Sequence, residues 1–491
     1  MPEKRTELLV APVPTGEKSE FPELAQLAAQ VGDGRLLKME YDYTKDVDAA
    51  LPNADILAKT GNVAGAVESL NTLEKQSRLG SDMKSNARVV QHMVQMCFDG
   101  KQWDLLNETI LALSKKRLLI KVAIARMVRS CCQMVEKMPT EELRMKLIET
   151  LRTVTAGKIY VEVERARLTS YVVKKLEAQG KLEEAATMLL ELQVETYGSM
   201  EVKERVEFLL EQMRLSVARE DYVRASIIAK KISTKFFTKE PVEDQVQNLK
   251  LKFYELMITV GLHNNNYLDV CRHYRAIQET PKILGDLEKN KMALKCAVIY
   301  VLLAPHGNEQ WDLVHRLVQM RDLESILEYK KFLELFINQE IISWTELGKT
   351  YQALLRVGTP ANPATGIFDD SANGNKRWED LHVRVGEHNL RMVSKYYTQI
   401  TFDRLAELLD FPVAEMEQFL CNLIVNGMIP NAKIDRPNRI VNLKAKKAHV
   451  DHLDQWADNV RRLTDTLNKV SHLILKEEMV HKNLEQVSAI H

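Results

Sequence analysis

Residues 398–429 read TQITFDRLAELLDFPVAEMEQFLCNLIVNGMI, and the apolar positions in this stretch recur at helical spacing. Phe402, Leu405 and Leu409 fall on one face of a first predicted helix. A second helix is expected after Pro412, because proline is well tolerated in the first turn of a helix. The inner face of this second helix is expected to hold Val413, Met416, Phe419, Leu420, Leu423 and Ile424.

Gly427 follows the last apolar position and suits a helix end, since glycine adopts the left-handed conformation without strain. Two short segments, at 432–434 and 441–443, then flank the sequence RPNR at 436–439, whose proline and asparagine are typical of a turn. Helix, turn, helix and a two-stranded wing together predict a winged helix over residues 398–445.

Composition narrows the class of protein. The chain has 491 residues, with 68 Lys and Arg against 68 Asp and Glu, so its formal net charge is zero. This balance argues against nucleic acid as the main partner, because phosphate binding calls for a basic excess. The length predicts several domains or one extended array. The sequence shows neither a membrane-spanning run nor a signal-peptide pattern, so we expect a protein of the cytoplasm and nucleus that does not enter membranes.

A helical repeat with a period of about 40 residues runs through the first half of the chain. Turn signals between helical segments recur near residues 61, 100, 140, 180, 220 and 265, and the clearest is AQGKLEEA at 178–185. One hairpin cannot cover its own apolar face, so neighbours must stack. We therefore expect an all-α solenoid of TPR-like helical hairpins over 35–270, after a flexible arm at 1–34. An irregular helical domain with accidental spacing is the alternative.

Residues 271–397 are expected to form helices that lead into the winged helix. Within them, composition shifts at 358–376 to Pro, Gly, Asn and Asp, which predicts an exposed and mobile loop. Helical patterning resumes at Trp378.

The last segment, 449–490, contains no Gly or Pro and predicts one long helix. Apolar residues alternate along it at spacings of three and four, as in a coiled coil. These residues are Leu453, Trp456, Val460, Leu463, Leu467, Val470 and Ile474. Such a stripe requires partner helices. Packing on its own domain is the alternative, but no nearby segment offers a matching seam, so a bundle with helices of other chains is favoured.

No catalytic or cofactor motif is found. The sequence lacks a Gly-rich phosphate loop, HExxH and a CxxC pair. Its six cysteines, two of them adjacent at Cys131 and Cys132, are expected to be reduced and packed. His449 and His452 lie three residues apart without further ligands, so we expect solvated histidines and no metal site. The prediction is a protein without enzymatic activity or cofactor.

The second helix of the winged helix decides between nucleic acid and protein as its partner. A recognition helix should present Arg, Lys, Asn or Gln to DNA, but this one carries Glu415 and Glu417 and no Lys or Arg. Basic residues around the wing leave a weak phosphate contact open. Pairing of the wing edge with another protein is favoured, because an open sheet edge accepts a further strand. The residues expected at this interface are Ile434, Asp435, Arg439, Val441 and Leu443.

Several longer strings carry a family resemblance. They are LQVETYGSM at 192–200, KERVEF at 203–208, EQMRL at 211–215, HYRAI at 273–277, KYYT at 395–398, HLI at 472–474 and KEEM at 476–479. With the layout of helical repeats, winged helix and long last helix, they resemble PCI-domain proteins, and among these the p55-type non-ATPase subunits of the proteasome regulatory-particle lid. The resemblance covers residues 35–486. Pro412 departs from it, since the family pattern has a capping Ser at this position.

The resemblance implies a non-catalytic subunit of a hetero-oligomer. It implies that the winged helices of PCI subunits line up side by side and that their last helices form a bundle. It also implies contacts of the solenoid with the deubiquitinating subunit and the ATPase ring, in support of the degradation of ubiquitylated proteins. A PCI subunit of the COP9 signalosome, or of another PCI complex, has the same architecture and is the alternative.

Overall fold

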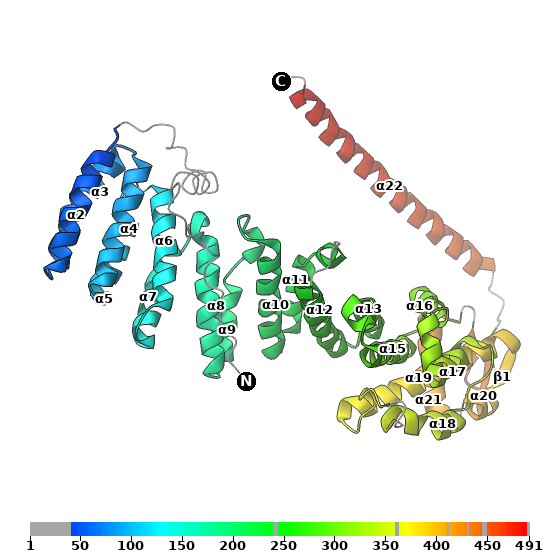
Figure 1. Cartoon of the computed structure of the whole chain (residues 1–491). Helices are drawn as coiled ribbons and strands as arrows, with labels where there is room; N and C mark the ends of the chain where they lie inside the picture. The colour runs from blue at the N-terminus through cyan, green and yellow to red at the C-terminus, as the bar shows by residue number, and fades with distance from the viewer. Residues whose placement is uncertain are drawn as a thin grey trace. The chain divides into compact units, whose positions relative to one another are not determined.

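The computed structural model describes residues 41–118, 120–238, 244–358, 363–409, 412–429, 432–443 and 449–488 (Figure 1). The chain divides into two compact units between Asn264 and Asn265. The arm expected at 1–34 lies outside the described residues. The domain boundaries expected at 270 and 397 stay predictions.

The first unit consists of helices laid side by side (Figure 1). They are α2 (Thr44–Lys59), α3 (Val63–Leu79), α4 (Met83–Asp99), α5 (Trp103–Lys115), α6 (Lys121–Glu136), α7 (Glu141–Thr155), α8 (Glu162–Ala178), α9 (Leu182–Leu190), α10 (Val202–Ala218), α11 (Tyr222–Lys231) and α12 (Asp244–His263), with the 3-10 helices η2 (Ile159–Val161), η3 (Val194–Thr196) and η4 (Thr234–Thr238).

Apart from α5, each helix of this unit packs on the next helix. Helix α5 packs on α7 instead, and α4, α6, α8 and α10 also pack on the even-numbered helix before or after them. This is the contact pattern of stacked hairpins, as the repeat predicts. The turns near 61, 100, 140, 180 and 220 each separate the two helices of one hairpin, and the turn near 265 follows α12. Gly61 and Gly180 have φ values of +92° and +79°, which explains glycine at these two turns.

The cores of the stacked hairpins are aliphatic and sulfur-rich. One continuous cluster extends from Val47 on α2 to Val172 on α8 and includes Cys97, Cys131 and Cys132. Five of the six cysteines are buried and Cys421 is half-buried, which confirms the expected packing. Burial raises the pKa of the Cys271 and Cys296 thiols to about 12, so neither is a nucleophile at neutral pH.

The second unit begins with a helical part that supports the winged helix. Its elements are α13 (Tyr267–Gln278), α14 (Pro281–Leu284), α15 (Leu287–Leu303), α16 (Asn308–Val318), the 3-10 helix η5 (Arg321–Ile326), α17 (Leu327–Ile337), α18 (Trp344–Arg356) and α19 (Ala372–Tyr396). Helix α15 is buried along its whole second half, from Ala293 to Leu303, and contacts α13, α16, α17 and α19.

The segment expected to be an exposed loop at 358–376 is in part buried and in part helical. Ile367 and Phe368 are 4% and 1% exposed, and Phe368 lies edge-on against Trp378, with the ring centroids 5.4 Å apart. Helix α19 starts at Ala372 because the hydroxyl of Ser371 accepts a hydrogen bond of 3.1 Å from the backbone N–H of Gly374. The expectation of exposure throughout was therefore wrong. Residues 359–362 lie outside the described residues.

The winged helix contains β1 (Gln399–Thr401), α20 (Phe402–Leu409), α21 (Val413–Val425), β2 (Lys433–Asp435) and β3 (Ile440–Asn442). Its sheet has three antiparallel strands in the order β1-β3-β2, and not the two expected. The third strand comes from β1, in which Ile400 pairs with Val441, while Ile434 pairs with Val441 from the other side. Strand β3 is therefore the central strand, and β1 and β2 form the edges.

The module has its own core. Phe402, Leu405 and Leu409 are buried as predicted, and Met416, Leu420 and Leu423 of α21 pack against them. Phe419 and Ile424 are partly buried, whereas Val413 is 40% exposed because it lies in the first turn of α21, beside Pro412. Pro412 is the N-cap and offers no side-chain hydrogen bond, yet its carbonyl accepts from Met416 at 3.0 Å, so the helix forms without a capping serine.

Candidate interaction surfaces

The longest candidate surface is α22 (His449–Ser488), a helix of 40 residues. Every described side chain from His452 to His481 is exposed. The apolar stripe predicted from the sequence lies fully in the open: Leu453, Trp456, Val460, Leu463, Leu467, Val470 and Ile474 have exposed fractions of 62%, 66%, 45%, 63%, 59%, 47% and 60%. A row of exposed aliphatic and aromatic side chains at coiled-coil spacing is typical of a helix that packs on other helices.

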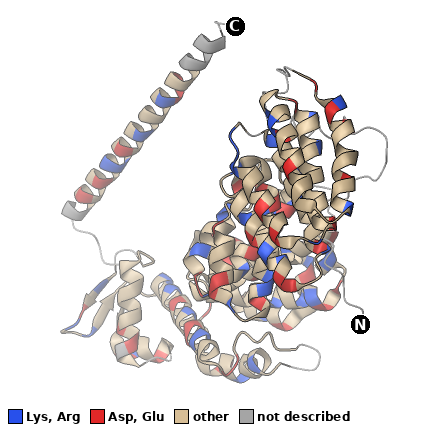
Figure 2. Cartoon of the chain, turned by 90° about the vertical axis from the view of Figure 1, so that its left-hand side faces the viewer, with Lys and Arg blue, Asp and Glu red and all other residues tan. Residues whose placement is uncertain are grey.

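The exposed apolar surface of α22 is wider than the predicted stripe. Leu473, Leu475, Met479 and Val480 are 57%, 57%, 67% and 44% exposed, so the second half of the helix is apolar on more than one side. The heptad rule singled out one seam and missed these residues, although Leu473 and Leu475 flank Ile474 in the sequence. Charged residues of both signs are spread along the part of the helix whose side chains are described (Figure 2). A helix with two apolar sides suits a bundle of several helices better than a pair.

The wing is the second candidate surface, and the structure divides its expected residues into two groups. Val441 and Leu443 are 0% and 2% exposed and belong to the core of the module, because β3 is paired on both sides. Their side chains are thus not available to a partner, and the expected open edge at Val441 is corrected to β2. Ile434 and Asp435 lie half-buried on this edge strand, and Arg439 is exposed at the turn with a φ of +52°. Whether β2 binds a partner stays a prediction.

An ion pair reduces the basic character of the wing. The Nε of Arg436 lies 2.7 Å from the Oε1 of Glu417, so a wing arginine is paired with the acidic helix α21. Together with Gln418, Cys421 and Asn422, these two side chains line an open recess on the outer face of the module. A phosphate would have to compete with Glu417 for this arginine, which further weakens the nucleic-acid interpretation.

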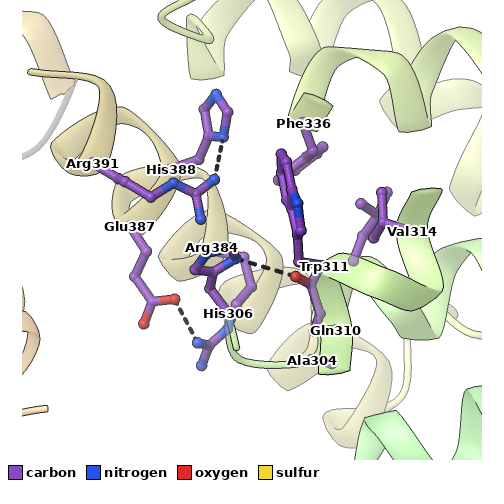
Figure 3. A pocket seen from close by; sticks show the side chains of 11 residues that line it. Ala304, His306, Gln310, Trp311, Val314, Phe336, Arg384, Glu387, His388 and Arg391 are labelled. Carbon is purple, nitrogen blue, oxygen red and sulfur yellow. Dashed lines mark hydrogen bonds and ion pairs between the residues drawn. The ribbon is translucent and has the colours of Figure 1, made fainter. Parts of the chain in front are cut away.

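A small cavity lies in the helical part of the second unit (Figure 3). Its volume is about 30 Å³, which is room for water and not for a substrate. Residues of α16, α17 and α19 and of the loop before α16 line it. Among them are His306 of that loop, Trp311, Phe336, Arg384 and Glu387. The guanidinium of Arg384 donates to Glu387 over 2.6 Å, and His306 and Gln310 are 3.2 Å apart.

His388, beside this cavity, has a structural role. Its Nε2 lies 3.1 Å from the carbonyl oxygen of Glu340, which only accepts, so Nε2 carries the hydrogen. Its Nδ1 then accepts from the Arg391 guanidinium at 3.1 Å. Burial lowers the pKa of His388 to about 4, so the ring is neutral and both of its nitrogens are used. His388 therefore has no free lone pair with which to act as a general base.

The described residues hold neither a metal-binding cluster nor a membrane-spanning helix. Within the described ranges, no group of three or more His, Cys, Asp and Glu residues is placed to hold a metal ion. None of the helices in the described part of the chain combines the length and the apolar character needed to cross a bilayer.

Three family models match successive parts of the chain. The N-terminal model of PSMD12/CSN4 matches residues 65–286, the PCI domain matches 355–445, and the C-terminal domain of the 26S proteasome regulatory subunit RPN5 matches 451–482. The 26S proteasome regulatory subunit rpn501 of Schizosaccharomyces pombe is 39% identical over 454 residues, which is 92% of this chain and 99% of that protein. The chain belongs to the RPN5/PSMD12 family of 26S proteasome regulatory subunits.

Other relatives agree with this assignment. The 26S proteasome regulatory subunit RPN5 of Saccharomyces cerevisiae is 38% identical over 91% of this chain and 98% of its own length. The COP9 signalosome complex subunit 4 of Drosophila melanogaster is 25% identical over 68% of this chain and 77% of its own length. The resemblance to PCI-domain proteins and to p55-type lid subunits is thereby confirmed. The RPN5 model at 451–482 coincides with the exposed part of α22.

Proposed function

We propose that this RPN5/PSMD12-family chain is a non-catalytic scaffold subunit of the proteasome lid. It joins other PCI subunits into a hetero-oligomer and so supports the ATP-dependent degradation of ubiquitylated proteins in the cytoplasm and nucleus. The deubiquitinase subunit and the ATPase ring are proposed neighbours of its solenoid. Membranes and nucleic acid are not proposed as partners.

The observation that carries this proposal is the exposed apolar stripe of α22. All seven predicted members are exposed by 45% or more, a state that a free helix does not favour in water. Burying even half of this stripe against partner helices would contribute several kcal/mol at about 25 cal/mol per Å². The helix thus fits a bundle whose other members come from other chains.

The second proposed surface is the edge strand β2. It has three residues, Lys433–Asp435, and only its inner side is paired, with β3. A neighbouring winged helix that adds a strand there would satisfy the outer backbone groups. The contact would be narrow, so it would fix the order of subunits more than it would hold them together.

A COP9 signalosome subunit, or a subunit of another PCI complex, remains the alternative function. It requires the same stripe and edge, so their geometry does not distinguish the complexes. The higher identity and coverage of the proteasome subunits support the lid. Purification of the tagged chain from its cells distinguishes them, because either the proteasome lid or a cullin-deneddylating complex accompanies it.

The stripe is tested by two charged substitutions on one face of α22. Leu463→Asp with Leu467→Asp places two carboxylates in the seam. The control, Arg461→Asp, changes the charge by the same two units and, with Asp465, gives two carboxylates of the same spacing on the side away from the seam and distant from Leu475 and Met479. We expect the seam variant to reduce incorporation into the assembled lid at least about tenfold on native gels. The control variant should assemble within about twofold of the unchanged chain. Normal assembly of the seam variant would refute the proposed role of α22.

A further inference from the structure

An exposed aliphatic side chain recurs at the junction between successive hairpins. Leu79, Leu118 and Ile159 are 52%, 56% and 77% exposed. Each lies just before the start of an even-numbered helix, namely α4, α6 and α8. The three residues therefore occupy equivalent positions in three consecutive repeats. We call them the turn ridge.

Stacking brings the turn ridge to one edge of the first unit. Helix α6 packs on both α4 and α8, and each hairpin returns the chain to the same side, so the starts of these helices lie next to one another. The guanidinium of Arg78 donates a hydrogen bond to the carbonyl of Arg117, which joins the first two turns directly. Beneath them, Ile120 packs in a small buried cluster that includes Val122, Ala123 and Ala87. Contacts of η2 with α6 place the third turn beside the second.

Leu118 is held in a conformation that leucine rarely adopts. Its φ is +59°, which lies in the left-handed region that glycine and asparagine adopt most readily. The cost is about 1 kcal/mol, and the exposed side chain recovers little of it in the free chain. Strain together with exposure at the middle of the turn ridge indicates a residue that is covered when the protein is in use.

The charges around the turn ridge have one sign. Lys115, Arg117 and Lys121 are exposed around Leu118, and the half-buried Lys158 precedes Ile159. Asp82, the carboxylate of the first turn, is 1% exposed and caps α4 by accepting from Ser85 at 3.1 Å.

Acidic residues mark the limits of this basic stretch. Glu162 is half-buried in the first turn of α8, and burial raises its pKa, so its charge is weakened. The exposed carboxylates lie farther out: Asp42 lies beyond the first turn and Glu201 lies beyond the third turn. The basic and aliphatic surface thus covers three turns.

We propose that the turn ridge binds an acidic amphipathic helix of a partner protein. Packed helices lie about 8–10 Å apart, and seven residues of a helix rise about 10.5 Å, so a partner with a leucine at every seventh position meets the three aliphatic side chains in turn. Alternate residues of a strand are about 7 Å apart and do not match. Acidic residues beside the partner's leucines would face Lys115, Arg117, Lys121 and Lys158.

The test uses the full chain and a fluorescent synthetic peptide of about 20 residues, with leucine at every seventh position and glutamate beside each leucine. Binding is measured by fluorescence anisotropy at low and near-physiological salt. Leu79→Ser, Leu118→Asn and Ile159→Ser are combined in one variant, and Arg117→Glu with Lys158→Glu in another. The matched controls are Val223→Ser with Ile227→Ser, which are exposed on α11, and Lys59→Glu with Lys101→Glu, at the opposite ends of the hairpins. Circular dichroism checks the folding of each variant, and Ile159→Ser alone serves if the triple variant unfolds.

We expect both ridge variants to weaken peptide binding at least about tenfold and both controls to leave it within about twofold. A peptide with lysine in place of glutamate should bind at least about tenfold more weakly. The inference is overturned if the acidic peptide does not bind, or if the controls weaken it as much as the ridge variants. It is also overturned if single-stranded RNA depends on the same aliphatic residues. Two further outcomes would also overturn it. If the free chain self-associates and the ridge variants abolish this, the surface binds a second copy of the chain. If residues 1–40 cross-link to the ridge and the ridge variants abolish this, the surface binds the chain's own first residues. None of these outcomes depends on which PCI complex contains the chain.

Discussion

Arg167 on α8 and Glu204 on α10 form a two-bonded ion pair, with Nε–Oε1 and Nη2–Oε2 distances of 2.7 and 3.0 Å. Arg214 on α10 and Glu177 on α8 form a second pair of the same kind, with distances of 2.6 and 2.8 Å. Arg129 on α6 bonds to Glu164 on α8 at 2.8 Å. Each pair connects even-numbered helices of neighbouring hairpins. These bridges fix the register in which one hairpin stacks on the next.

Loss of the Arg167 guanidinium should loosen the stack between α8 and α10. Both side chains of the pair are about one fifth to one quarter exposed, so we expect Arg167→Ala to destabilise this part by about 1–2 kcal/mol. Hydrogen exchange of α8 and α10 measures the effect. The control is Lys181→Ala, which removes an exposed pair with Glu184 at 3.4 Å and should cost under about 0.5 kcal/mol. Equal protection in the two variants would contradict the prediction.

The second unit should lose stability on mild acidification because of His388. Its folded pKa is about 4, against an unfolded value of 6.5, so below pH 6.5 the unfolded chain binds a proton that the folded chain does not. Stability is therefore full at neutral pH and falls by about 2 kcal/mol between pH 7 and pH 5 from this residue alone. Burial also lowers the pKa of His306, which acts in the same direction. Urea unfolding at several pH values measures the slope.

The variant His388→Gln separates this contribution from that of other groups. It should be less stable at pH 7, since glutamine does not reproduce both hydrogen bonds in the geometry of the ring, and its stability should vary less between pH 7 and pH 5. An unchanged pH slope in the variant would show that His388 is not the titrating group.

Truncation of two residues that pair in the sheet should have very different effects. Val441 is fully buried in the central strand, and Val441→Ala should destabilise the winged helix by roughly 2 kcal/mol. Ile434 is the half-buried partner of Val441 on β2, and Ile434→Ala should lower the stability of the winged helix by less than about 1 kcal/mol. Hydrogen exchange in α20 and α21 reports both values. A larger loss from Ile434→Ala would mean that β2, and not β3, supports the core.

The segment before α19 should become accessible to protease when Phe368 is removed. Phe368→Ala deletes a ring that is 1% exposed and packs on Trp378, and core truncations of this size cost about 3–5 kcal/mol. We expect cleavage within 363–371 at protease concentrations that leave the unchanged chain intact. Thr365→Ala is a control in the same segment and should keep the resistance of the parent.

Deletion of residues 451–491 should block assembly and leave the hairpin stack folded. All described side chains of α22 from His452 onward are exposed, so the first unit and the winged helix lose no described contact. Circular dichroism should show the loss of one long helix and unchanged thermal unfolding of the rest. Entry of the shortened chain into the complex at normal yield would contradict the proposed role of this helix.

Features that depend on neighbours in the sequence were predictable. The hairpin turns follow from left-handed positions such as Gly61 and Gly180, and the ends of α21 follow from Pro412 and Gly427. The stripe on α22 follows from spacing alone, since a regular helix places every third and fourth residue on one side. Two expectations were wrong. Helix α19 begins before Trp378, because Ser371 caps it, and the segment before α19 is not exposed throughout, because Phe368 is buried against Trp378.

Local sequence by itself determined the hairpin repeat, the two helices of the winged module and the exposed seam of α22, because helical periodicity and turn residues act over a few positions. Only the tertiary structure decided which wing residues are buried, since Ile400 pairs with Val441 across the whole module and makes β3 central. It also decided that Leu79, Leu118 and Ile159 share one edge. They lie a full repeat apart in the sequence, and stacking of the hairpins, a contact between distant residues, brings them together.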